Sequence, residues 1–136
     1  MSAYKKPVPV PDHVSAPYWA GCARHELLLQ CCDACGTVQF YPRPICLSCM
    51  SEQLTWKKAD GKGTIHTFST IRQNRSPGFV EDVPYVLAVV TLDEGPNMTT
   101  NIVQCAPEDV RIGLPVEVVF EDISDGISLP KFRPAS

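Results

Sequence analysis

The alternation of apolar and polar residues divides the chain into three parts. Residues 1–14 contain three prolines and show no periodicity, which predicts an extended arm. An apolar stripe at helical spacing begins at Tyr18, with Ser15 placed to cap the first turn and Pro17 tolerated inside it. Three short apolar segments, separated by turns, follow before residue 60. Residues 15–60 are therefore predicted to form a helix and a small ribbon of strands.

From residue 61 to 136 the pattern is that of β-structure throughout, so the fold class is mainly β. β-branched and aromatic residues dominate the predicted strands, and one segment, 84–92, is apolar on both faces, as suits a central barrel strand. One helical turn is expected at 106–110, between the third and fourth strands. The predicted strands are 63–71, 84–92, 98–104, 116–120 and 129–132. This order fits a five-stranded OB-fold barrel, and an SH3-like barrel is the nearest alternative.

Four cysteines form two pairs, each with two residues between its members. Each pair can wrap a tight turn around one side of a metal ion, and the intervening residues can form a hairpin that brings the pairs face to face. Gly36 follows the first pair directly, where the backbone often needs a positive φ. Cys31 could compete with its neighbour as a ligand, but Cys32 has the spacer that matches the second pair. The predicted ligands are Cys32, Cys35, Cys46 and Cys49.

Four thiolates arranged tetrahedrally suit Zn²⁺, and iron in a rubredoxin-like site is the alternative. Zinc is favoured because the second pair lacks the proline and glycine expected of a redox iron site. Four protein ligands leave no open position for water or substrate, so the metal is predicted to be structural. Its binding would supply folding free energy that a ribbon of about 35 residues cannot obtain from apolar burial alone.

Composition narrows the classes of protein that fit. No apolar run approaches the ~18 residues of a membrane span, and the first residues lack the apolar core of a signal peptide. Seven cysteines, an odd number, then indicate reduced thiols and a cytoplasmic location. The net charge of −3 argues against nucleic-acid binding, which normally needs a basic face.

Candidate catalytic groups are few. His13, His25 and His66 have no serine or aspartate at a recognisable nucleophile spacing, so we expect satisfied surface or strand histidines. Cys105 follows a predicted strand and is expected to behave as a small buried hydrophobe. Four basic residues flank the barrel strands, where they could hold anionic phosphates or serve solubility alone. They are Arg72, Arg75, Lys131 and Arg133.

Several short motifs, in a specific order from about Ser15 to Arg133, together resemble a known family. The motifs are Tyr18-Trp19, Leu27-Leu28-Leu29-Gln30, Cys32-x-x-Cys35-Gly36, Pro42-Arg43-Pro44-x-Cys46-x-x-Cys49, Gly61-x-Gly63, Val89-Val90-x-Leu92-Asp93-Glu94-Gly95 and Ile112-Gly113-x-Pro115-Val116. They look like the zinc-ribbon plus OB-fold family known as "domain of unknown function 35".

The resemblance implies a small non-catalytic subunit of a thiolase-superfamily enzyme, in a hetero-oligomer whose partner supplies the activated cysteine. It also implies that this subunit helps to complete the acyl-CoA site. CoA carries phosphates, so the four basic residues become candidate CoA contacts, with Arg72 and Arg75 in a long polar loop typical of binding loops. Aromatic residues are candidate anchors for the partner, unless they pack between ribbon and barrel. They are Tyr18, Trp19, Phe40 and Tyr41.

Two other functions remain as alternatives. Ribbon and OB modules both occur in single-stranded nucleic-acid binders, which show a basic groove with exposed aromatics. A rubredoxin-like electron carrier would instead be a red protein with visible absorbance.

Overall fold

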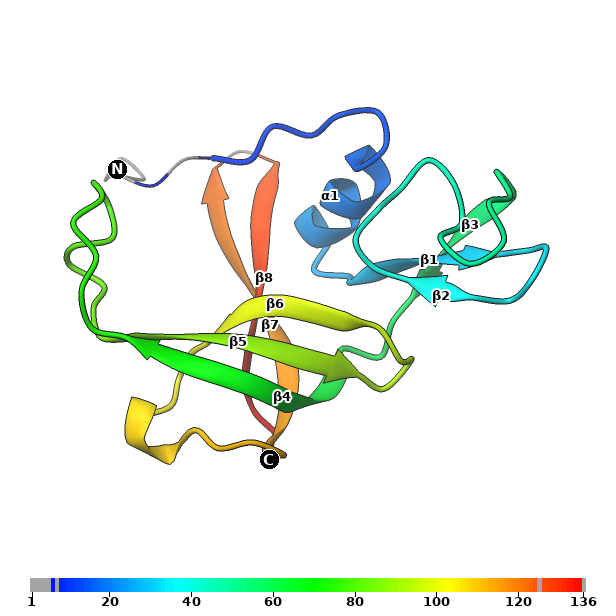
Figure 1. Cartoon of the computed structure of the whole chain (residues 1–136). Helices are drawn as coiled ribbons and strands as arrows, with labels where there is room; N and C mark the ends of the chain where they lie inside the picture. The colour runs from blue at the N-terminus through cyan, green and yellow to red at the C-terminus, as the bar shows by residue number, and fades with distance from the viewer. Residues whose placement is uncertain (1–5, 7, 125, 136) are drawn as a thin grey trace.

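A computed structural model of the chain describes residues 6, 8–124 and 126–135. In these residues a short helix leads into a three-stranded ribbon and then into a closed five-stranded barrel (Figure 1). The ribbon projects on one side of the barrel, and the loop between the first two barrel strands projects on the other (Figure 1). The predicted arm lies partly outside the described residues, and residues 8–12 have no regular secondary structure.

Helix α1 (Ala16–Ala23) forms where the apolar stripe predicts it, with Pro17 in its first turn. The prediction that the Ser15 side chain caps this helix is wrong. Its hydroxyl accepts a hydrogen bond from the amide of Asp12 at 3.2 Å, and the Asp12 carboxylate accepts one from the Ser15 amide at 2.7 Å. The hydroxyl is therefore turned toward the preceding residues rather than toward the free amides of the helix.

The ribbon is an antiparallel sheet with the strand order β2-β1-β3. Its strands are β1 (Leu28–Cys32), β2 (Val38–Gln39) and β3 (Leu54–Lys58). The central strand, β1, pairs with β3 along all five residues but with β2 over only two. Such a small sheet leaves the segments that join its strands largely without backbone partners from the sheet itself.

The barrel has the strand order β4-β5-β6-β8-β7 and closes between β7 and β4. Its elements are β4 (Lys62–Ile71), β5 (Tyr85–Leu92), β6 (Asn97–Ile102), the 3₁₀ turn η1 (Pro107–Asp109), β7 (Pro115–Ser124) and β8 (Ile127–Pro134). The expected helical turn thus lies between the third and fourth barrel strands, and the predicted OB-fold is confirmed. The last two strands are longer than the apolar pattern alone indicates, because polar residues continue their pairing.

One hydrophobic core joins the two parts of the chain. Tyr18 and Cys22 of α1 and Leu29 of β1 are buried in the same cluster as Val90 and Phe132 of the barrel. On β5, buried and more exposed positions alternate, so only one of its two apolar faces is fully covered. The helix and ribbon therefore pack on the barrel as a continuation of its core.

No helix among the described residues has both the length and the apolar character needed to cross a membrane.

Candidate metal centre and neighbouring grooves

The two cysteine turns are built alike. In each turn, the backbone amide of the residue after the second cysteine donates to the carbonyl of the first cysteine. The distances are 2.8 Å from Gly36 to Cys32 and 2.9 Å from Met50 to Cys46. The donor residue has a left-handed backbone in both turns, with φ +80° at Gly36 and +66° at Met50. The positive φ expected at Gly36 is confirmed, and Met50 adopts the same conformation without the freedom of glycine.

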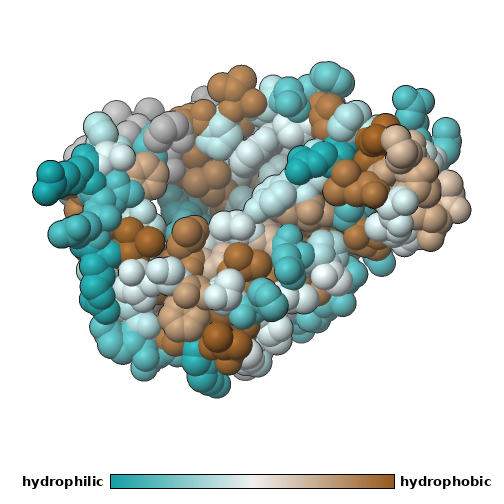
Figure 2. Space-filling view, in the orientation of Figure 1, coloured by the Kyte–Doolittle hydropathy of each residue, from teal (hydrophilic) through white to brown (hydrophobic). Residues whose placement is uncertain are grey.

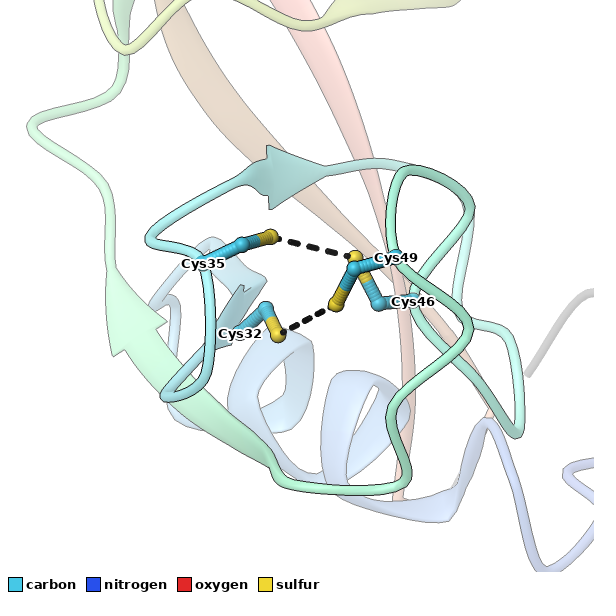
Figure 3. A group of neighbouring side chains, drawn as sticks. All are labelled: Cys32, Cys35, Cys46 and Cys49. Atoms are coloured by element: carbon cyan, nitrogen blue, oxygen red, sulfur yellow. Dashed lines mark hydrogen bonds between the residues drawn. The ribbon is translucent and has the colours of Figure 1, made fainter.

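The four paired cysteines point toward one another (Figure 3). Their Sγ atoms all lie within 4.8 Å of one another, with 3.6 Å from Cys32 to Cys49 and 3.6 Å from Cys35 to Cys46. A tetrahedron with Zn–S bonds of about 2.3 Å has S···S edges of about 3.8 Å. The number, chemistry and spacing of these donors therefore fit a tetrahedral zinc ion, and they support the predicted structural zinc.

Local hydrogen bonds prepare part of this cluster for ionisation. The hydroxyl and the backbone of Thr37 lower the pKa of Cys35 to about 6, with the hydroxyl 3.1 Å from Sγ. The backbone of Cys49 lowers the pKa of Cys46. The backbone of Ser51 also lowers the pKa of Cys49, but the neighbouring thiols outweigh it and raise this pKa to about 12. Closely spaced thiols do not all ionise by themselves, so a divalent cation is what stabilises four thiolates together, and its binding releases protons.

The remaining cysteines lie outside the cluster, and all seven are free thiols. Cys31 is the neighbour of a cluster member on β1, and successive side chains of a strand point to opposite faces, so it does not compete with Cys32. Cys22 is fully buried, and burial raises the pKa of its thiol to about 11. Cys105 is half-buried against the core, which partly matches the buried hydrophobe expected there.

The histidines form no catalytic set within the described residues. His25 lies 2.9 Å from a carboxylate oxygen of Asp122 and stacks on Phe120, which joins the end of α1 to β7. The hydroxyl of Ser128 donates to the same carboxylate rather than to the imidazole, so nothing activates it as a nucleophile. His25 is thus a satisfied surface histidine, as expected.

A groove of about 560 Å³ runs beside the junction of β6 and β8. Its wall includes Phe79 and Asp82 of the β4–β5 loop, Lys131 of β8, and apolar side chains of β5 and β6. Lys131 is not a free cation there, because its ammonium lies 2.7 Å from the carboxylate of Glu121. The groove is therefore lined by apolar side chains and by the ion pair between Lys131 and Glu121.

The other basic residues differ in their surroundings. Arg133 pairs with Glu117 at 3.2 Å, and these residues face each other directly across β7 and β8. Arg72 and Arg75 are exposed in the β4–β5 loop and have no ion-pair partner among the described residues. The structure therefore separates the four basic residues into two paired with glutamates and two without an ion pair in its described part.

A second groove, of about 270 Å³, lies between the helix–ribbon part and the barrel. All four predicted anchor residues line it, and the rings form a chain in which Tyr18 contacts Trp19 and Phe40, and Phe40 contacts Tyr41. Tyr18 is buried, whereas Tyr41 is 41% exposed. These aromatics thus pack between ribbon and barrel, and Tyr41 also reaches the molecular surface.

The junction of β6 and β8 is open for a backbone reason. Their parallel pairing consists of Ile102 opposite Phe132. The next step of such a ladder would need the amide of residue 130 to donate to Thr99, but residue 130 is proline and has no amide hydrogen. The Thr99 amide, a separate backbone group at this junction, donates to the Tyr41 hydroxyl at 3.0 Å and fastens the ribbon loop to this barrel edge.

Sequence reasoning missed the buried amides of the ribbon. Gln30 and Gln39 are each only 5% exposed and bond to each other at 2.9 Å. The available signal was a glutamine in each of two otherwise apolar ribbon segments. Apolar side chains are also exposed at the ribbon end of the molecule (Figure 2), where the second cysteine turn carries Leu47 and Met50, exposed by 63% and 73%.

Comparison with known families covers both parts of the chain. The model of the rubredoxin-like zinc ribbon domain of ChsH2 matches residues 19–55, and that of the C-terminal OB-fold domain of ChsH2 matches residues 56–121.

Individual relatives match across the same regions. A DUF35 domain-containing scaffold protein of Methanocaldococcus jannaschii is 41% identical over 76% of this chain and 77% of its own length. A probable enoyl-CoA hydratase alpha subunit of Thermomonospora curvata is 33% identical over 96% of this chain, which spans only 40% of that relative. A solved structure described as the Ltp2-ChsH2(DUF35) aldolase contains a chain with a TM-score of 0.85 and 32% identity, covering 94% of this chain and 99% of that one.

Proposed function

Because the chain belongs to the DUF35 family of zinc-ribbon and OB-fold proteins, we propose that it is a non-catalytic accessory subunit of an acyl-CoA-processing complex. The observation that carries this proposal is the end-to-end similarity to a chain of the Ltp2-ChsH2(DUF35) aldolase. Relatives described as a scaffold protein and as the alpha subunit of a hydratase support it as well.

The partner in this proposal is a thiolase-superfamily enzyme, in keeping with the family resemblance of the sequence. Leu47 and Met50 are exposed apolar residues of the second cysteine turn, and Tyr41 is the most suitable anchor among the four aromatics because it is the most exposed. The seven free cysteines support a reducing compartment, the cytoplasm, for the assembly.

A hydratase is the second candidate partner. It is favoured by the relative named as a hydratase alpha subunit, whose match extends over 96% of this chain. Both candidates place the same chain in an acyl-CoA complex and differ in the reaction that the partner performs.

The ribbon in this proposal holds one structural Zn²⁺ through Cys32, Cys35, Cys46 and Cys49. The metal ion would cross-link β1 and the first cysteine turn to the loop that carries the second turn. Iron at this site would colour the purified protein, so absorbance and elemental analysis separate the two metals.

CoA is proposed to contact the basic residues through its phosphates. Arg72 and Arg75 carry most of this role, because Lys131 and Arg133 are already paired with glutamates. In the assembled complex, Arg72→Ala and Arg75→Ala should raise the apparent KM for acyl-CoA. A charge-assisted hydrogen bond contributes about 1.5–3 kcal/mol, or about tenfold to a hundredfold in affinity. Arg111→Ala, an exposed arginine outside this loop, is the control.

Co-expression tests the assembly itself. The chain is produced with a thiolase-superfamily subunit or with a hydratase subunit of the same genome, and gel filtration with light scattering reports the mass of any complex. A stable complex with the thiolase-like subunit supports the proposal, and one with the hydratase subunit supports the second candidate. A chain that remains alone and binds single-stranded oligonucleotides with an affinity that falls as salt rises would support the nucleic-acid alternative instead.

A further inference from the structure

The loop that leads from β2 to the second cysteine pair has no regular secondary structure to hold its backbone. Pro42 and Pro44 have no amide hydrogen and cannot donate backbone hydrogen bonds. The backbone amides and carbonyls of Arg43, Ile45 and Leu47 are therefore most of the groups that can fix the chain around the ligand at position 46. Buried polar groups without partners destabilise a fold by about 1–3 kcal/mol each. The position of this loop therefore depends on partners from elsewhere in the ribbon.

Two glutamines provide those partners. Gln30 of β1 and Gln39 of β2 face each other in the strand register, and each is only 5% exposed. The Gln30 carbonyl oxygen accepts hydrogen bonds from the Gln39 amide at 2.9 Å and from the backbone amide of Arg43 at 2.8 Å. The Gln30 amide donates to the backbone carbonyl of Arg43 at 2.8 Å. One side chain thus holds both polar backbone groups of Arg43.

Gln39 holds the loop on both sides of the metal-facing cysteine. Its amide donates to the carbonyl of Ile45 at 3.2 Å, and its carbonyl oxygen accepts a hydrogen bond from the amide of Leu47 at 3.0 Å. Cys46 lies between these two residues and is fully buried. Cys46 itself bonds within its turn, its amide to the Ser51 carbonyl and its carbonyl to the Met50 amide, so the Gln39 side chain fixes the residues on either side of that turn's first cysteine.

We propose that Gln30 and Gln39 are positioning residues for the metal centre. By holding residues 43–47 before a metal arrives, they bring the Cys46 thiolate to the other three sulfurs, so that less order has to be created on binding. The inference rests on the proposed zinc site. Loss of groups that orient metal ligands typically weakens metal affinity tenfold to a hundredfold, and we expect this range for Gln39.

The test measures Zn²⁺ affinity of the full chain by competition with a chromophoric chelator, for wild type and three variants. Gln39→Leu removes every hydrogen bond of the Gln39 side chain. Gln39→Glu keeps the oxygen that accepts from the Leu47 amide, but its second oxygen replaces the donor and faces the carbonyl oxygens of Gln30 and Ile45. Both should bind Zn²⁺ ten to a hundred times more weakly. Gln30→Glu keeps both accepted bonds and sets an oxygen against one acceptor, the Arg43 carbonyl, where Gln39→Glu does so against two, so its affinity should fall less. Gln53→Leu, an exposed ribbon glutamine, should match wild type.

Spectra of the Co²⁺-loaded chain separate positioning from loss of a ligand. The variants should still show the absorption of a four-thiolate site at saturating Co²⁺. Wild-type affinity in Gln39→Leu and Gln39→Glu would overturn the inference, and if neither folds, wild-type affinity in Gln30→Glu would overturn it. A wild-type chain that takes up neither Zn²⁺ nor Co²⁺ would instead refute the proposed metal site, and the inference with it.

Discussion

Replacement of Cys46 by serine tests the metal centre most directly. Cys46 is fully buried, and its Sγ lies 3.6 Å from that of Cys35, so a serine hydroxyl would occupy the cluster without being a comparable zinc ligand. Structural zinc sites bind with about 10–16 kcal/mol. If the four thiolates contribute equally, the loss of one removes about 2.5–4 kcal/mol, which weakens zinc binding by about two to three orders of magnitude.

The same loss should appear as instability of the ribbon. The two-residue strand β2 and the loop after it have little regular pairing, so they depend on the metal more than the barrel does. For a domain of this size, 2.5–4 kcal/mol corresponds to about 10 °C or more in Tm. Zinc content by elemental analysis and Tm with and without a chelator measure both effects. Cys105→Ser, half-buried and outside the cluster, is the matched control.

Two results would refute this reasoning. One is a Cys46→Ser chain that keeps one equivalent of zinc and the Tm of the wild type. The other is iron in place of zinc in the wild-type protein, which would leave the ligand geometry intact but make the structural assignment wrong.

Two further predictions concern the backbone and the acid limit of stability. Both Met50 and Gly36 have a left-handed backbone, which glycine adopts without strain, so Met50→Gly should raise the free energy of unfolding by up to about 1 kcal/mol and Gly36→Ala should lower it by about 1 kcal/mol. Urea unfolding measures both changes, and two changes of the same sign would contradict the argument. Hydrogen bonds from Ser128 and then His25 lower the pKa of Asp122, so its stabilising contribution is present above about pH 4 and is lost as the pH falls through its lower folded-state value. Tm measured from pH 7 to pH 3 should therefore fall less steeply in Asp122→Asn than in wild type, and parallel curves would show that this carboxylate plays no part.

Much of the fold follows from local sequence. Each Cys-x-x-Cys turn is closed by a hydrogen bond between residues four positions apart, so the turns that begin at Cys32 and Cys46 depend on neighbours along the chain. The order of the strands is also legible, because each is an apolar or β-branched segment between turn residues. The Ser15 cap was wrong for the same local reason: a hydroxyl has several nearby amides to choose from, and here it bonds to that of Asp12.

The site beyond the cysteines required the tertiary structure. Whether a basic residue is paired depends on its place in the fold: strand register sets Glu117 opposite Arg133, whereas Arg72 lies in the β4–β5 loop and has no ion-pair partner in the part of the chain that the structure describes. The bond between Tyr41 and Thr99 likewise joins residues 58 positions apart. Sequence alone determined the ligand type and the order of elements, because both depend on residue chemistry and short-range spacing. Pairing between distant side chains was decided only when one shared core brought ribbon and barrel together.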